Sequence, residues 1–121
     1  MNACTNQLGM KDGNIRDDQI TSSSEHDANH GASNARLDRD AGGGRTGSWS
    51  ARNNDLNQWI QVDFGTLTSV SGVTIQGRQE SDQWVTSYKV MYSYDNIQWK
   101  YITDDNIVPM VSNVLLICIS N

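Results

Sequence analysis

Two histidines four residues apart come closest to a metal-binding pattern in this chain. His26 and His30 are flanked by Glu25 and Asp27. Such spacing serves a transition metal when both rings share one face of a helix and further ligands converge on them. The segment has the composition of a loop, so the spacing defines no shared face. We therefore expect no transition-metal site here.

Sequence patterns typical of catalytic sites are missing. The chain has no nucleophile-elbow motif and no Cys–His pair with an orienting carboxylate. The glycine-rich residues 42–47 lack the strand, lysine and following helix of a phosphate-binding loop. The carboxylate pairs Asp17-Asp18 and Asp104-Asp105 are adjacent, so in a strand their side chains would diverge. We predict that the protein is not an enzyme.

Chain length, composition and net charge limit the number of domains and the classes of binding partner. The 121 residues suit one domain; only 36% are hydrophobic, but four Trp and four Tyr give a modest core large side chains to bury. A net charge of −5 argues against binding to nucleic acid and disfavours purely electrostatic binding to anionic lipid headgroups. The longest apolar run, residues 107–119, is interrupted and shorter than the ~20 residues of a membrane-spanning helix. The first residues do not have the pattern of a signal peptide.

Alternating hydrophobicity predicts strands from the middle of the chain onward. Residues 59–64 form the first, with a turn at 65–66 and a second strand over 69–76 that contains a β-bulge at Gly72. The inward side chains of the first strand are Ile60, Val62 and Phe64.

Residues 86–94 give the clearest strand pattern. They are followed by a tight turn at Asp95-Asn96, where Asn tolerates a positive φ, and by a strand over 98–102. Short strands in quick succession, with almost no helix, predict an all-β antiparallel sandwich or barrel. One face of the strand over 86–94 carries Tyr88, Val90, Tyr92 and Tyr94.

A set of motifs in a consistent order resembles the discoidin family, also called coagulation factor 5/8 type C domains. The most recognisable motif is QWIQVDFG at residues 58–65. The resemblance covers residues 4–105 and implies an antiparallel β-sandwich of the jelly-roll, galactose-binding-domain-like type. The other matching segments are residues 4–15, 19–24, 35–37, 47–51, 76–78, 83–90 and 92–99.

The resemblance stops before the end of the chain. Residues 106–121 do not resemble the family's last strands, so we expect an incomplete, C-terminally truncated domain at 4–105 and a non-matching tail. Family domains pair their opening cysteine with one in the last strand, which here suggests a Cys4–Cys118 disulfide; two free thiols are the alternative. A truncated product without function is one alternative for the whole chain.

The resemblance implies a non-catalytic binding module. Its relatives bind glycans, anionic phospholipid headgroups, collagen or protein termini through loops at one end of the barrel, here residues 25–31, 40–46 and 79–83. Their side chains offer polar groups for sugar hydroxyls and ring faces for sugar rings; an ordinary solvated surface is the alternative for each. The candidate ligand-binding residues are His26, Asp27, Asn29, His30, Arg45, Glu80, Asp82 and Trp84.

Acidic loop tips favour one ligand class over another. Glu25 and Asp27 flank the first tip, and Glu80 and Asp82 lie in the third, so an anionic lipid surface would repel them. We expect galactose-type glycans or glycoproteins of the cell surface or matrix as partners. A peripheral phosphatidylserine-binding module is the alternative. The implied location is extracellular, as a secreted protein or an ectodomain.

Two further expectations concern ions and internal packing. No cofactor is predicted, although the resemblance allows a structural Ca²⁺ held by loop carbonyls and a carboxylate. We expect Trp59 and Trp99 in the core. Arg36 and Arg78 are expected to make internal ion pairs, with Asp63 a candidate acceptor.

Overall fold

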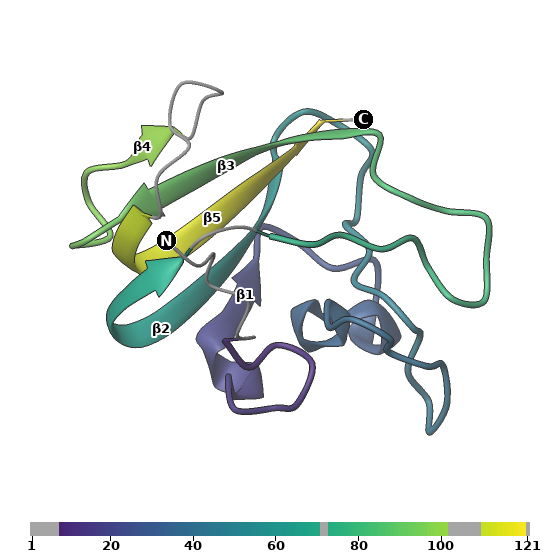
Figure 1. Cartoon of the computed structure of the whole chain (residues 1–121). Helices are drawn as coiled ribbons and strands as arrows, with labels where there is room; N and C mark the ends of the chain where they lie inside the picture. The colour runs from purple at the N-terminus through teal and green to yellow at the C-terminus, as the bar shows by residue number, and fades with distance from the viewer. Residues whose placement is uncertain (1–7, 71–72, 102–109, 121) are drawn as a thin grey trace.

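The computed structural model describes residues 8–70, 73–101 and 110–120, which form a five-stranded antiparallel sheet (Figure 1). The prediction of an all-β antiparallel fold is therefore confirmed. Among these residues, no helix is long and apolar enough to cross a membrane. In sheet order the strands are β1 (Ile20–Ser22), β2 (Gln58–Val70), β5 (Met110–Ser120), β3 (Ser87–Ser93) and β4 (Lys100–Tyr101). Single turns of 3₁₀ helix accompany them at η1 (Asp17–Gln19), η2 (Ala28–His30) and η3 (Ala32–Asn34).

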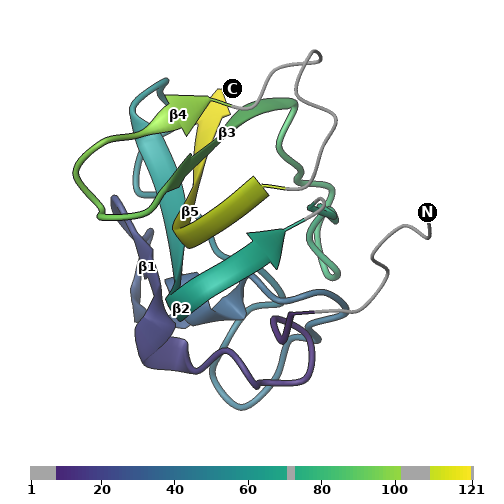
Figure 2. The same cartoon turned by 60° about the vertical axis from the view of Figure 1, so that its left-hand side comes forward.

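Strand β2 runs further than its sequence pattern predicts. The turn expected at residues 65–66 is wrong, because the strand continues through Gly65 in a bulge where the register against β5 shifts between Asp63 and Thr68. Gly65 has a φ of 77°, and its N–H donates to Oδ1 of Asp63 at 2.9 Å. A glycine accepts this left-handed backbone without a Cβ clash. Figure 2 shows β2 and β5 bending together, as a bulge in a paired strand requires.

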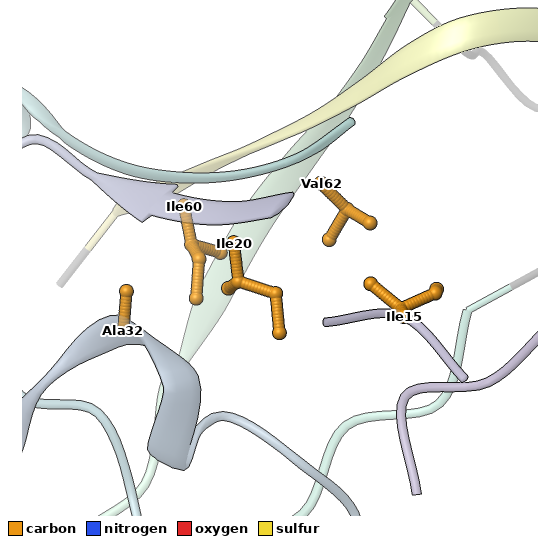
Figure 3. Packing of buried hydrophobic residues seen from close by; sticks show 5 residues of the cluster. All are labelled: Ile15, Ile20, Ala32, Ile60 and Val62. Atoms are coloured by element: carbon orange, nitrogen blue, oxygen red, sulfur yellow. The ribbon is translucent and has the colours of Figure 1, made fainter. Parts of the chain in front are cut away.

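The hydrophobic core lies between one face of β1 and β2 and the segments before and after β1. Ile60 and Val62 point into it from β2, as predicted, and Ile20 of β1 pairs in register with Val62 (Figure 3). Ile15 and Ala32 close the cluster from outside the sheet. Burial of such side chains stabilises a fold by about 1.5–3 kcal/mol each for Val and Ile. Partly buried residues packed around the cluster are Met10, Ala35, Trp49 and Phe64.

The tyrosine face of β3 continues the core face of β2. Val62 and Tyr92 both lie opposite Leu115 in register, and directly opposed residues share a face of a sheet. Away from the core this face opens to solvent, so that Tyr88 is 43% and Tyr94 50% exposed. The strand predicted over 86–94 is confirmed as β3 with slightly shorter bounds.

The turn after β3 also matches its prediction. Asn96 has a φ of 61°, and the backbone N–H groups of Asp95 and Asn96 donate to Oγ of Ser93, which is almost fully buried. The expected core positions of the tryptophans are less well met, since Trp59 and Trp99 are only half-buried. Trp59 neighbours Ile60 in β2 and therefore lies on the opposite sheet face.

Two predicted strands are shorter than expected. The strand over residues 69–76 is correct only as far as Val70, the end of β2, and the bulge at Gly72 lies outside the described residues. The strand over 98–102 is reduced to β4 within the described chain.

The C-terminal segment supplies the middle strand of the sheet. β5 pairs with β2 on one side and with β3 on the other. The structure places the backbone of Met110–Ser120 in the centre of the sheet. The division into a domain at 4–105 and a tail at 106–121 stays a prediction. The Cys4–Cys118 disulfide lies outside the described part of the chain, because Cys4 is not among those residues and only the backbone of Cys118 is placed.

Candidate functional site

The first loop follows β1, contains η2 and leads directly into η3, and its own carboxylates hold it in place. Oδ1 of Asp27 caps η2 by accepting a hydrogen bond from the N–H of Asn29 at 2.9 Å. The Glu25 carboxylate accepts from the N–H of Ala32 at 2.8 Å. Both carboxylates therefore order the backbone that presents the loop's side chains.

The two histidines of this loop lie edge to face. Their ring centroids are 5.0 Å apart at an interplanar angle of 84°. His30 is largely covered, with 14% of its side chain exposed, whereas His26 is exposed. Nδ1 of His30 lies 2.6 Å from Oδ1 of Asp27, and this hydrogen bond is the main cause that lowers the pKa of the Asp27 carboxyl. Among the described residues, no group of three or more His, Cys, Asp or Glu side chains is placed to hold a metal ion.

The second loop is a tight hairpin around three glycines. Gly42 and Arg45 exchange two backbone hydrogen bonds, at 3.0 and 3.1 Å. Gly43 and Gly44 between them have φ values of 61° and 81°, which suits a two-residue turn of the type that needs positive φ at both positions. The turn fixes the backbone of Arg45, whose side chain is exposed.

The carbonyl oxygen of Asn29 joins the first loop to the second. It accepts hydrogen bonds from the N–H of Thr46 at 2.9 Å and from Oγ1 of Thr46 at 3.1 Å. Nδ2 of Asn34 donates to the same oxygen at 2.8 Å. The position of the first loop thus depends on the second.

Arg78 organises the third loop. Its N–H donates to the carbonyl of Gln83 at 2.9 Å, and its guanidinium donates to Oε1 of Gln83 at 2.7 Å and to Oε1 of Glu80 at 2.5 Å. The predicted ion pair of Arg78 is therefore confirmed. Arg36 also makes one, at 2.7 Å, but with Asp17. The expected acceptor Asp63 is wrong, because neither arginine pairs with it among the described ion pairs.

Glu80 joins the third loop to the second. Both of its carboxylate oxygens accept from the N–H of Gly47, at 3.1 and 3.2 Å. The close approach requires a glycine, since a Cβ at position 47 would lie 2.7 Å from the carbonyl oxygen of Arg39 and 2.7 Å from Oε2 of Glu80. The hydrogen bond from Arg78 is the main cause that lowers the pKa of the Glu80 carboxyl, with the Gly47 N–H contributing.

These contacts gather the three loops on one side of the sheet, away from β4 (Figure 1). The candidate residues then divide by what their atoms do. The carboxylate of Glu80 and the carbonyl of Asn29 join the loops to one another, whereas Asp27 and His30 order the first loop from within. The side chains of the others face solvent, and Trp84 is 66% exposed: His26, Arg45, Asp82 and Trp84.

Sequence reasoning missed the residues that join the loops. Thr46 and Gly47 belong to the glycine-rich run, which was read only as loop. Their partners Asn29 and Glu80 are 17 and 33 positions away, and no local pattern marks such a distant pair. Arg39, whose carbonyl lies beside Gly47, gave no sequence signal either.

Comparison with known proteins identifies the family. Residues 19–115 match the family model of the F5/8 type C domain. The chain is 38% identical over 107 residues to rat lactadherin and 35% identical over 106 residues to pig coagulation factor V. These alignments cover 82% and 83% of this chain, but only 24% and 5% of the two relatives. The chain belongs to the F5/8 type C, or discoidin, domain family, and it spans a quarter or less of these relatives.

Solved structures support the same fold. Discoidin II from Dictyostelium discoideum matches with a TM-score of 0.76 and 26% identity, over 84% of this chain and 48% of that one. The family 32 carbohydrate-binding module of NanJ from C. perfringens, solved with galactose, matches with a TM-score of 0.60 over 88% of this chain and 86% of that one. At 20% identity the second likeness concerns the fold alone. The β-sandwich class inferred from the sequence is thereby confirmed.

Proposed function

We propose that the chain is a non-catalytic extracellular binding module that recognises galactose-type glycans, free or on glycoproteins, through its three joined loops. The observation that supports this most is the hydrogen-bonded joining of the loops at Asn29–Thr46 and Gly47–Glu80, with exposed polar and ring groups beside the joints. A preorganised set of loops lowers the entropy cost of binding a small polar ligand.

The exposed side chains of these loops suit a sugar. His26 and Trp84 offer ring faces, and an indole that is 66% exposed can cover the apolar face of a pyranose. Arg45 and Asp82 offer charged hydrogen-bonding groups for hydroxyls. The galactose complex of a module with this fold, NanJ, is in keeping with the proposal.

The charge of the chain favours a glycan over a membrane. The net charge is −5, and exposed Asp27 and Asp82 lie in two of the three loops. An anionic bilayer repels such a surface, whereas a neutral sugar does not. A phosphatidylserine-binding module is the competing outcome of the test below.

The test is a titration of the immobilised 121-residue chain with a galactose-terminated oligosaccharide and, separately, with phosphatidylserine liposomes at two salt concentrations. We expect saturable sugar binding and no salt-sensitive liposome binding. Asp82→Ala should weaken sugar binding about ten- to hundred-fold, since charged hydrogen bonds carry such factors. The matched control is Asp18→Ala, which removes another exposed carboxylate, paired with Arg16 outside the loops. Liposome binding without any sugar binding would replace the glycan proposal by the membrane one.

A further inference from the structure

Asp38, two residues before the second loop, has a backbone conformation that residues other than glycine rarely adopt. Its φ is 56°, and among the non-glycine residues that the structure describes only Asn96, in the turn after β3, shares a positive φ. A residue with a Cβ stays in this left-handed region where the surrounding structure holds it there, and such positions cluster at functional sites. The contacts of Asp38 therefore show what its conformation serves.

Gln76 binds Asp38 at two points. Its Nε2 donates a hydrogen bond to Oδ1 of Asp38 at 2.9 Å, and its Oε1 accepts one from the backbone N–H of Asp38 at 2.6 Å. One amide group thus contacts both the carboxylate and the main chain of the same residue. Gln76 lies between β2 and the third loop, 38 positions along the chain from Asp38. The contact connects the start of the second loop to the segment that leads into the third.

Lys11 makes a third contact with Asp38, from the N-terminal side of the chain. Its Nζ lies 2.7 Å from Oδ2 of Asp38. The neighbouring Met10 packs against the hydrophobic core, and its carbonyl accepts a hydrogen bond from Arg36 at 2.7 Å. The hydrogen bond from Lys11, and then that from Gln76, lowers the pKa of the Asp38 carboxyl, so the group is a carboxylate at neutral pH. Asp38 therefore joins Gln76 to a segment that is anchored in the core.

These contacts fix one end of the second loop, and Glu80 fixes the other. The loop follows Asp38, and it ends at Gly47, whose N–H donates to the Glu80 carboxylate at 3.1 Å. Both ends are thus attached to the segment that contains Gln76 and the third loop. A loop held at both ends presents its exposed Arg45 at one place, whereas a loop released at one end can pivot about the other.

We propose that Asp38 is a positioning residue of the glycan site, which keeps the second loop beside the third through its contacts with Gln76 and Lys11. The inference rests on the proposed glycan binding and adds to it a residue that acts without touching the sugar. If Asp38 mattered only for backbone strain, a glycine would serve at least as well. The positioning role requires an acceptor for Gln76 in addition to the left-handed backbone.

Three replacements of Asp38 separate its hydrogen bonds from its backbone strain. Asp38→Asn keeps an acceptor for Gln76, tolerates a positive φ and removes an exposed ion pair, so the affinity for a galactose-terminated oligosaccharide should stay within about threefold. Asp38→Gly relieves the backbone but removes the side chain. Its affinity should fall about tenfold if about one molecule in ten keeps the binding arrangement of the loops. Asp38→Ala adds strain to the same loss and should bind no better than Asp38→Gly.

Two further variants complete the binding experiment. Gln76→Ala removes the same hydrogen bonds from the other side, so it should reproduce the loss in Asp38→Gly. Asp18→Ala is the matched control, because it removes an exposed carboxylate that is paired with Arg16 outside the loops. Isothermal titration of the full chain gives affinity and stoichiometry separately. A loss of folded protein therefore lowers the number of sites, whereas a misplaced loop lowers the affinity.

A second readout does not depend on sugar binding. In the unliganded chain, the heteronuclear NOE of the Gly43 and Gly44 amides should fall in Asp38→Gly and Gln76→Ala and be retained in Asp38→Asn. Unchanged affinity and NOE values in Asp38→Gly would overturn the positioning role while leaving glycan recognition in place. An equal loss of affinity in Asp38→Asn and Asp38→Gly would also overturn it, because the charge of Asp38 would then matter and not its contact with Gln76. If the wild-type chain binds no sugar, the glycan proposal is rejected, and the NOE values still decide whether Asp38 orders the second loop.

Discussion

The carboxylate of Glu80 accepts hydrogen bonds from the backbone N–H of Gly47 at 3.1 and 3.2 Å, across 33 positions of the chain. This contact connects the second loop to the third, and the hydrogen bonds from Thr46 to the carbonyl of Asn29 connect the first loop to the second. The sequence predicts Glu80 as a direct ligand contact. Its geometry makes it a positioning residue, because both of its oxygens are occupied by the protein.

Replacement of Gly47 should separate the second and third loops. In Gly47→Ala the new Cβ would lie 2.7 Å from the backbone oxygen of Arg39, so the backbone itself must move. We expect faster amide hydrogen exchange at Gly47's neighbours and a loss of affinity for every saccharide. Gly77→Ala, just before the third loop, is the matched control, because a Cβ there meets its nearest atoms at 3.4 and 3.5 Å. Similar exchange rates in the two variants would contradict the proposal that the Gly47–Glu80 contact holds the second and third loops together.

The hydrogen bonds between the Glu80 carboxylate and the Gly47 N–H should also respond to acid. The pKa of Glu80 is lowered from its ordinary value of 4.5, mainly by Arg78, so the folded state prefers the carboxylate. A group with a depressed folded pKa contributes stability above its unfolded pKa and loses it as the pH falls through the folded value. The loops should therefore stay joined at neutral pH and separate below about pH 4.5. The chemical shift of the Gly47 amide, followed from pH 7 downward, should show a transition with its midpoint below 4.5 that is missing in Glu80→Gln. A midpoint above that value would be inconsistent with the contact.

Two adjacent positions of β2 test the assignment of its faces. Val62 is 6% exposed in the core, so Val62→Asp buries an unpaired charge and should cost about 3 kcal/mol or more, enough to unfold a marginal domain. Gln61 lies on the opposite face, and Gln61→Asp should cost less than about 1 kcal/mol. Urea denaturation followed by tryptophan fluorescence measures both. Equal destabilisation would mean that the faces are assigned wrongly.

Strand β2 shows how much of the fold can be predicted from the sequence. The alternation of Ile60, Val62 and Phe64 was enough to predict the strand and its inward face, because burial of one sheet face imposes a period of two. The same local pattern wrongly predicts a turn at Gly65. Whether a glycine with positive φ ends a strand or forms a bulge depends on the partner strand, and here β5 continues past it. That information is not local.

The candidate site was predictable in its composition but not in its roles. Polar loops of the right chemistry could be found from the resemblance, yet Asp27 and Glu80 turn out to accept hydrogen bonds from the protein's own backbone. Free and engaged carboxylates look alike in a sequence.

The most direct test of a sugar-stacking surface concerns Trp84. Its side chain is 66% exposed, so Trp84→Ala should change the free energy of unfolding by no more than about 0.5 kcal/mol. If the indole covers a sugar ring, the same change should weaken saccharide binding about tenfold or more, as exposed aromatic anchors of binding sites do, and Trp84→Phe should restore part of the loss. Ile97→Ala is the matched control, because Ile97 is 79% exposed but lies after the turn between β3 and β4. Isothermal titration with a galactose-terminated oligosaccharide gives the affinities. An equal loss in both alanine variants, or none in either, would remove Trp84 from the binding surface.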